Sequence, residues 1–409
     1  MPEGDGEDRA LRIALVCPYS LSRPGGVQGQ VTGLARTLSR RGHVVAVFAP
    51  VDGPVALPDG VALVATGHST SIRGNGSVAP VSVSPAAARR GVAELRAFNP
   101  DVVHVHEPFA PGLSYALLVA PDLRLIVATF HRSGGSALYT LLSPVARPLA
   151  GRLAVRCAVS DAAAETARRA LKGTYEVLFN GIETDRFDGV EAWPTTGPTA
   201  LFLGRHEERK GLAVLLEAWS LLGAADPDSG PPVGRPVLWV AGDGPQTEAL
   251  RRRHPESDTV RWLGVVDEDE KIRRLLAADV LVAPALGGES FGMVLVEAMA
   301  ARAVVVASDI VGYRDAAGGH AVLVPPGDVP ALAAALGGVF DGTLAPARPS
   351  GAGSAGPEAG GSGGSEADRS GDRRRWLDEA AGRAARWSMT SLAERYEELY
   401  RSVMVGDRS

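Results

Sequence analysis

The sequence lacks most of the features that would place it in a membrane or outside the cell. It has only two cysteines among 409 residues, Cys17 and Cys157, and both fall in or beside apolar runs. We therefore expect buried thiols in a reducing compartment. No run of eighteen apolar residues occurs, so no transmembrane helix is expected. The first eight residues are polar and acidic, which does not fit a signal peptide. These absences predict a cytoplasmic protein.

Lysine is also scarce, with Lys172, Lys210 and Lys271 against 39 arginines. The net charge is −5, and no basic tract is dense enough to indicate binding to nucleic acid. Residues 1–190 nevertheless hold 19 Arg and Lys against 16 Asp and Glu. This mild excess either favours an anionic partner, such as the inner face of the cell membrane, or is a random scatter of arginines.

The length predicts two domains, and the apolar pattern shows where they lie. A strand at 12–16, a helix at 27–41 and a strand at 44–48 form a βαβ unit. Further apolar runs without alternation predict buried parallel strands at 102–105, 125–129 and 153–159. After residue 198 the pattern restarts, with strands expected at 200–203, 237–241, 260–263, 280–283, 304–307 and 321–324 and helices that include 211–222, 268–277 and 329–336. The fold class is α/β, with two successive doubly wound sheets.

The remaining segments differ in composition from these two domains. The expected organisation is a disordered N-terminus (1–10), a first domain (11–188), a linker (189–198), a second domain (199–341), a disordered insert rich in Gly, Ser and Pro (342–372), and C-terminal helices (373–409). The last helix, expected at 390–403, has apolar residues at core spacing. We expect it to pack back on the first domain.

The most informative segment is 287–297, which combines a glycine-rich loop with an apolar helix. Ser290 is a candidate N-cap, which would leave the amides of Phe291 and Gly292 as donors for an anion. Glu289 lies in the loop, and Glu297 lies about two turns into the helix. A carboxylate on such a segment needs hydrogen-bond donors, which a pair of sugar hydroxyls would supply. The alternative is a solvated glutamate and a simple cap.

Two loops that follow expected strands could bind phosphate groups. Arg205 and Lys210 bracket the first of them, and two fixed cations near a helix N-terminus suit a diphosphate. In the first domain, Gly26 belongs to a Pro-Gly-Gly turn in which backbone amides can approach an anion. The alternatives are surface charge and a plain tight turn.

Three further positions follow strands or lie in turns. His131 ends a buried strand, where ligands of open α/β sheets bind, although a lone histidine is often structural. Asn75, Gly76 and Ser77 form either a substrate loop or a turn. Gly242 opens a Gly-Asp-Gly-Pro segment that is typical of a turn.

No motif requires a metal or a tightly bound cofactor. Residues 267–269 have the form DxD, but they open an expected helix, where acidic residues suit the dipole. Residues 104–107 (His-Val-His-Glu) are favoured as a polar strand end over a metal site, since no further ligand cluster accompanies them.

As a set, these motifs resemble the family 4 glycosyltransferases of the GT-B fold. They are Pro24-Gly25-Gly26, Gly204-Arg205 with Lys210-Gly211, Gly242-Asp243-Gly244-Pro245, and Glu289-Ser290-Phe291-Gly292 with Glu297. Together with the segments 16–28 and 104–108, they are most similar to the actinobacterial phosphatidylinositol mannosyltransferases. The resemblance implies two Rossmann-like domains with an interdomain cleft, of which the first binds the acceptor and the second a nucleotide sugar.

The resemblance also implies roles for individual residues. The implied donor-binding residues are Gly26, Arg205, Lys210, Gly242, Glu289, Ser290, Phe291, Gly292 and Glu297, with Glu297 on the ribose. The implied catalytic residues are His131, Arg205, Lys210 and Glu289, with His131 near the reacting carbon of the sugar. Asn75, Gly76 and Ser77 would lie near the acceptor.

The expected function is retaining transfer of a hexose from a nucleotide-diphosphate sugar to a lipid or small-molecule acceptor. Mannose from GDP-mannose and phosphatidylinositol follow from the resemblance alone. The alternatives are another nucleotide sugar with a non-inositol acceptor, a GT-B epimerase or phosphorylase, and a non-catalytic glycan-binding scaffold. The four charged residues Arg205, Lys210, Glu289 and Glu297 together argue against the scaffold.

Overall fold

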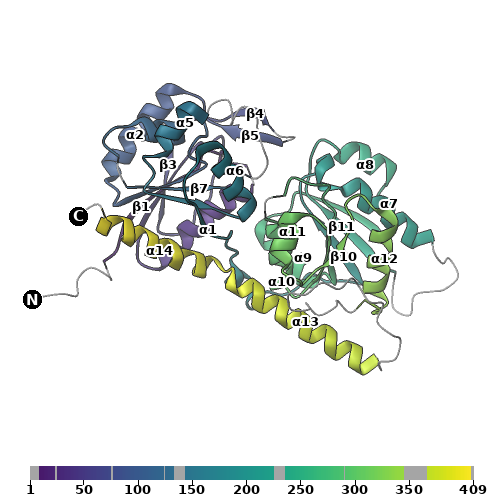
Figure 1. Ribbon diagram of the computed structural model, residues 1–409. Coiled ribbons are helices and arrows are strands. Elements are labelled where there is room, and N and C mark those ends of the chain that lie inside the picture. The colour runs from purple at the N-terminus through teal and green to yellow at the C-terminus, as the bar shows by residue number, and fades with distance from the viewer. Residues whose placement is uncertain are drawn as a thin grey trace, which may run out of the picture. The chain divides into compact units, whose positions relative to one another are not determined.

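The computed structural model describes residues 9–23, 25–74, 77–123, 125–132, 143–224, 235–289, 291–344 and 366–406. The chain forms two compact units, shown in Figure 1. The first runs to Glu183 and resumes at Trp387, and the second spans Thr184–Arg386. The boundary thus precedes the linker expected at 189–198. Trp193 explains why that linker belongs to the second unit, because its ring lies under the guanidinium groups of Arg273 and Arg274.

The first unit contains a seven-stranded sheet in the order β3-β2-β1-β6-β7-β8-β9, and every neighbouring pair is parallel. Its strands are β1 (Arg12–Val16), β2 (Val44–Ala49), β3 (Val61–Ala65), β6 (Val102–His106), β7 (Ile126–Phe130), β8 (Val155–Ala158) and β9 (Glu176–Val177). Strand order reverses between β1 and β6. In such sheets ligands bind beyond the carboxyl ends of the strands at the reversal.

Helices cover both faces of this sheet, which explains why its central strands are apolar without alternation. The helices are α1 (Gly26–Arg40), α2 (Pro85–Phe98), α3 (Leu113–Val119), α5 (Ser143–Ala150), α6 (Asp161–Leu171) and α14 (Met389–Gly406). Ala14 and Val16 pack with residues of α2, α3 and α6, whereas Ile13 and Leu15 pack with residues of α1 and α14. Alternate residues of β1 therefore face two separate apolar layers.

The last helix, α14, covers a buried polar layer in the first unit. His104 Nδ1 lies 2.7 Å from the hydroxyl of Tyr400, and its Nε2 lies 2.7 Å from Thr129 Oγ1. The hydroxyl of Tyr396 lies 2.8 Å from the same Thr129 oxygen. All four side chains are buried, so these bonds replace bonds to water. Burial lowers the pKa of His104 to about 3, and its ring is therefore neutral at pH 7.

An ionic contact fixes the outer side of α14. Glu397 pairs with Arg41 and with His43 Nε2, the latter at 3.1 Å. His43 Nδ1 accepts a hydrogen bond from the backbone amide of Leu11 at 3.1 Å, which leaves Nε2 to carry the proton that faces Glu397. The end of the chain is therefore tied to residues just before β1 and β2.

The second unit repeats the architecture with a six-stranded sheet in the order β12-β11-β10-β13-β14-β15, again parallel throughout. Its strands are β10 (Thr199–Leu203), β11 (Val237–Ala241), β12 (Val260–Gly264), β13 (Val280–Ala283), β14 (Val304–Ser308) and β15 (Val322–Val324). The order reverses between β10 and β13. The residues beyond these two strands therefore lie where a ligand is expected.

The helical segments of the second unit extend further than the sequence predicts at its C-terminal end. They are η1 (Thr184–Phe187), η2 (Glu208–Lys210), α7 (Leu212–Ala224), α8 (Thr247–Arg253), α9 (Glu268–Ala277), α10 (Met293–Ala300), α11 (Val311–Ala317), α12 (Val329–Phe340) and α13 (Glu366–Arg386). Residues 366–372 were expected to be disordered and are helical. Trp376 of α13 is buried among residues of α7 and α12, and a helix anchored by such packing extends at little cost.

A short antiparallel hairpin, β4 (Thr70–Gly74) with β5 (Ser77–Val81), completes the first unit. Tyr19 bridges to Val81 of the hairpin, next to the loop after β1. Cys17 and Cys157 are buried and unbonded to each other, as the sequence predicts. No helix in the described part of the chain combines the length and apolar character needed to cross a membrane.

Replacing Tyr400 by phenylalanine should destabilise the protein. The change removes the hydroxyl that bonds His104 Nδ1 and leaves that nitrogen buried without a partner, which costs about 1–3 kcal/mol. Urea unfolding at pH 7 measures the loss. Tyr115→Phe, on the exposed face of α3, is the matched control and should change stability little. Equal stability of the two variants would contradict the role of the polar layer.

The same layer predicts acid sensitivity. The pKa of His104 is near 6.5 in an unfolded chain and about 3 in the folded protein, so between these values only the unfolded state binds the proton. The stabilisation is therefore complete above pH 6.5 and is lost as the pH falls. Between pH 8 and pH 5 we expect a loss of about 2 kcal/mol from this residue. Urea unfolding of the wild type and of His104→Gln at both pH values isolates the contribution of His104 to this loss of stability. An identical loss in both proteins would refute that contribution.

Candidate functional site

In the second unit, two loops at the strand-order reversal lie against each other. The loop after β10 ends at Gly211, which has a φ of +71°, and a Cβ there would lie 1.9 Å from the carbonyl oxygen of Pro284 in the loop after β13. Leu286 N also donates to Arg209 O at 2.8 Å. Only glycine permits this approach, so Gly211 allows the two loops to pack against each other.

These loops bring together a cluster of charged side chains. Glu289 Oε1 accepts from Arg209 Nη1 at 2.6 Å and lies 2.8 Å from Lys210 Nζ. Arg209 Nε also donates to Glu207 at 3.0 Å, and Arg205 Nε lies 3.2 Å from the same carboxylate. The side chains of Glu207 and Glu289 are only 7% and 13% exposed. Three cations thus face two carboxylates, which leaves one positive charge for an anionic ligand.

The cluster differs in one respect from the sequence prediction. Arg205 and Lys210 were expected to bracket the site, and Lys210 does pair with Glu289. Arg209, which sequence reasoning did not select, also bonds Glu289, whereas Arg205 is half exposed and pairs only with Glu207 among the described residues. The charged run Glu-Glu-Arg-Lys that contains Arg209 was the available signal.

The loop after β11 packs closely on the loop after β10. Gly242 has a φ of +123°, and a Cβ on it would lie 1.9 Å from the carbonyl oxygen of Gly204. His206 is buried beside it and its Nδ1 lies 2.7 Å from Thr247 Oγ1, which donates to Asp243 at 2.6 Å. Gly242 is therefore required by the backbone packing that shapes the loop containing Arg205.

The helix in the most informative segment begins later than the sequence predicts. Its N-cap is Gly292, with a φ of +88°, and α10 starts at Met293, so the prediction of Ser290 as N-cap is wrong. Ser290 itself lies outside the described residues. A Cβ on Gly292 would lie 2.7 Å from the ring of Tyr313, so close packing favours glycine over a side-chain cap. Phe291 is buried just before the cap.

Glu297 faces α9 rather than open solvent. Its Oε1 lies 3.1 Å from Nζ of Lys271, and that ammonium group also lies 2.8 Å from Glu268. Burial alone would lower the pKa of Lys271, but the two carboxylates raise it above its usual value. The prediction from sequence identified Glu297 and missed Lys271, which lies 26 residues away.

The acidic segment that opens α9 serves the helix itself. Asp267 Oδ1 accepts the amide of Glu270 at 2.8 Å and is the N-cap. In the residues that the structure describes, no three His, Cys, Asp or Glu side chains are arranged to hold a metal ion.

In the first unit, Gly26 begins α1 and nothing lies within 4 Å of the position of its missing Cβ. Gly25 is the N-cap, and Gln28 Nε2 donates to the carbonyls of Ser20 and Arg23, which fixes the preceding loop. Pro24, Asn75 and Gly76 lie outside the described residues, and Ser77 begins β5.

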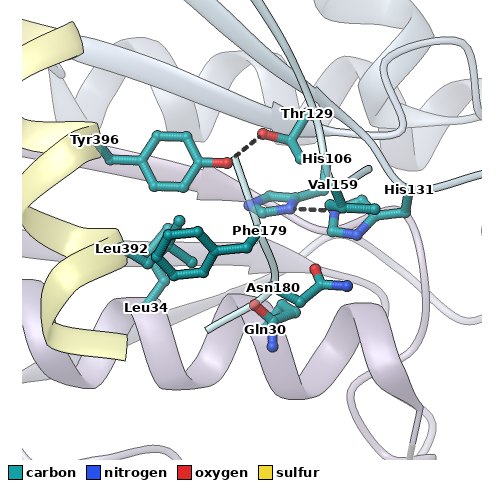
Figure 2. A pocket seen from close by; sticks show the side chains of 10 residues that line it. All are labelled: Gln30, Leu34, His106, Thr129, His131, Val159, Phe179, Asn180, Leu392 and Tyr396. Atoms are coloured by element: carbon teal, nitrogen blue, oxygen red, sulfur yellow. Dashed lines mark hydrogen bonds between the residues drawn. The ribbon is translucent and has the colours of Figure 1, made fainter. Parts of the chain in front are cut away.

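His131 follows β7 and lies beside a second histidine. Its Nε2 lies 2.8 Å from Nδ1 of His106, and its backbone amide donates to Glu107 Oε1 at 2.7 Å. Burial lowers the pKa of His131 to about 3, so the ring is neutral at pH 7. Figure 2 shows both histidines in the wall of a pocket, which also has Asn180 in its lining. The polar strand end expected at 104–107 is therefore a set of hydrogen-bonded side chains.

Comparison with known proteins agrees with both halves of this architecture. Residues 24–186 match the family described as Glycosyltransferase Family 4, and residues 197–341 match the family described as Glycosyl transferases group 1. Among solved structures, the glycosyltransferase from Rickettsia africae superposes with a TM-score of 0.66 at 17% identity, covering 96% of this chain and 98% of that one. This likeness supports the GT-B fold.

Curated relatives are closer in sequence. A phosphatidyl-myo-inositol mannosyltransferase from Mycolicibacterium smegmatis is 41% identical over 338 residues, covering 81% of this chain and 85% of the relative. The protein of the same name from Propionibacterium freudenreichii is 35% identical, covering 75% of this chain and 79% of the relative. With the two-sheet fold and the charged cluster already described, this identity shows that the chain is a GT-B glycosyltransferase and belongs to the phosphatidyl-myo-inositol mannosyltransferase family.

Proposed function

We propose that the protein transfers mannose from GDP-mannose to phosphatidylinositol, with retention of the anomeric configuration. The name of the curated relatives supports the choice of sugar and acceptor. The observation that carries the proposal is the cluster of Arg205, Arg209 and Lys210 with Glu289 at the strand-order reversal of the second unit.

The proposed donor site uses the excess positive charge of this cluster. The diphosphate replaces Glu289 as the partner of Lys210, and Arg205 is exposed enough to turn toward the same anion. Glu289 then accepts hydrogen bonds from the sugar hydroxyls. We also propose that Ser290, Phe291, Gly292 and Gly242 lie near the donor, and that Gly26 lies near its diphosphate.

The reaction breaks the bond between the anomeric carbon and the phosphate oxygen, and it forms a bond from that carbon to the acceptor oxygen. The departing phosphate takes the proton of the acceptor hydroxyl on the same face, which gives retention. Negative charge grows on the leaving oxygen, and fixed cations stabilise it without reorganisation. Because Arg205, Arg209 and Lys210 supply this charge, we propose that the reaction needs no tightly bound cofactor.

Other residues are proposed to position the two substrates. Glu297 would accept the ribose hydroxyls, and Lys271 holds its carboxylate in place at 3.1 Å. In the first unit, neutral His131 would hydrogen-bond the transferred sugar near its reacting carbon. Asn75, Gly76 and Ser77 are proposed to lie near the acceptor.

A lipid acceptor requires contact with a membrane surface, and we propose a peripheral one on its cytoplasmic face. Exposed Arg89 and Arg90 on α2 suit anionic head groups. Val83, just before α2, and Val145 of α5 are 47% and 64% exposed. Apolar side chains of this kind can enter the boundary between head groups and acyl chains.

Substitution of the cluster tests the proposed donor site. Lys210→Ala removes a preorganised donor worth roughly 2.7–4 kcal/mol of barrier and should lower kcat on the order of a hundredfold or more. Glu289→Gln should also lower the rate, because the amide accepts more weakly. Transfer from radiolabelled GDP-mannose to phosphatidylinositol measures both. Lys172→Ala, at the exposed end of α6, is the control. Near-full transfer by both site variants would overturn the assignment.

Nucleotide binding separates a transferase from a non-catalytic scaffold. A ligand at a hundred times its Kd stabilises a protein by about 2.7 kcal/mol, so GDP should raise the Tm. We expect no comparable rise with UDP, and a smaller rise with GDP in Lys210→Ala. If UDP alone raised the Tm, the proposed donor would be a UDP-sugar instead of GDP-mannose. No response to GDP, UDP or ADP would favour the scaffold.

A further inference from the structure

The first unit contains a row of three histidine rings that the proposed reaction uses only at one end. His104 and His106 lie on β6, and His131 follows the neighbouring strand β7. The ring centroids of His104 and His106 are 4.3 Å apart, and those of His106 and His131 are 5.1 Å apart. The row therefore runs from the polar layer under α14 to the pocket that His131 lines.

The contact between His106 and His131 holds a single proton. Burial lowers the pKa of both rings, so each is neutral at pH 7 and carries one N–H. The 2.8 Å distance between His106 Nδ1 and His131 Nε2 requires that one nitrogen donates and the other accepts. Either ring could be the donor on distance alone.

The other nitrogen of His106 decides the direction. Its Nε2 is buried and has no hydrogen-bond partner among the described residues. If His131 were the donor, His106 would carry its proton on that nitrogen and would bury an unpaired N–H. An orphaned buried N–H is rarer than an unpaired acceptor. In the favoured arrangement His106 Nδ1–H donates to His131 Nε2, because this leaves no unpaired N–H on His106.

We propose that His106 is a positioning residue that holds His131 in the tautomer with its proton on Nδ1. For the transfer reaction this inference rests on the proposed function, in which His131 contacts the sugar. His131 then presents an N–H donor to the pocket, where Figure 2 shows its other ring nitrogen on the side lined by Asn180. Such a group donates to a hydroxyl oxygen and has no free nitrogen to act as a base.

Both histidines are fixed by further contacts, so the arrangement is rigid. His106 stacks on His104, which is held at both nitrogens by Tyr400 and Thr129. The backbone amide of His131 is held by Glu107. The ring of His131 is therefore oriented from its main chain and from its Nε2, while its Nδ1 has no hydrogen-bond partner among the residues that the structure describes.

The tautomer can be measured in the free full-length protein, without substrate. Long-range ¹⁵N–¹H NMR on histidine-labelled protein distinguishes protonated from bare ring nitrogens, and loss of the signal in His131→Asn assigns it. We expect a protonated Nδ1 and a bare Nε2 for His131. A protonated Nε2 would overturn the proposal. In His106→Phe, which keeps an aromatic ring for stacking, the single tautomer should give way to a mixture.

Kinetics test the role in transfer. His106→Phe should lower kcat about tenfold while KM for GDP-mannose stays within about twofold. His106→Asn, whose side-chain amide can still donate from the position of Nδ1, should recover part of the loss. His320→Phe, a buried histidine of the second unit, is the control for placing phenylalanine in a core. The Tm of each variant checks the fold.

The outcomes separate this inference from the proposed function. Full activity of His106→Phe together with an inactive His131→Ala would overturn the positioning role and leave the site assignment standing. Full activity of His131→Ala would overturn the role of His131 in transfer, and the NMR result would then still decide the tautomer. A loss in His106→Phe that His106→Asn does not relieve would show that packing, rather than the donated hydrogen bond, matters.

Discussion

Close backbone approach at the carboxyl edge of the second sheet is the constraint on which the candidate donor site depends. Gly211 against Pro284 O and Gly242 against Gly204 O bring three loops to distances that no Cβ allows. This packing places Arg209 and Lys210, from the loop after β10, on Glu289, from the loop after β13. Without it, the two cations and the carboxylate would lie on two loops that do not meet. The electrostatics of the site are therefore a consequence of two glycines.

Much of the fold follows from local sequence, because buried parallel strands are continuous apolar runs with turn residues at their ends. The strand Val280–Ala283 and the helix Glu268–Ala277 have the predicted bounds. The strand Val61–Ala65 was not predicted, although its sequence is also an apolar run; in the structure it lies at the sheet edge and several of its residues are exposed. Ser290 was misassigned as a cap because its sequence cannot reveal the ring of Tyr313, which fixes the helix start at Gly292.

The charged residues show a similar limit. Lys210 and Glu289 could be selected because each stands in a recognisable loop, and the structure pairs them. The partner of Glu297, Lys271, could not, since contacts between α9 and α10 depend on how two helices pack on one sheet. The role of His106 could not be predicted either, because it depends on His131, which follows the neighbouring strand. Nor could the contact of Tyr400 with His104, which lies 296 residues away in the sequence. Sequence patterns identify which groups carry chemistry, whereas tertiary packing decides what each one touches.

The docking of α14 has a consequence for synthesis of the chain. The helix supplies Leu392, Tyr396 and Tyr400 to the core of the first unit, but it is translated after the whole of the second unit. While the roughly two hundred residues of the second unit are synthesised, the face of the N-terminal sheet that α1 and α14 share is therefore covered by α1 alone. For that interval the apolar residues that α14 covers are exposed and His104 Nδ1 lacks the hydroxyl of Tyr400, which favours aggregation. Truncation before α14 would leave that face permanently exposed.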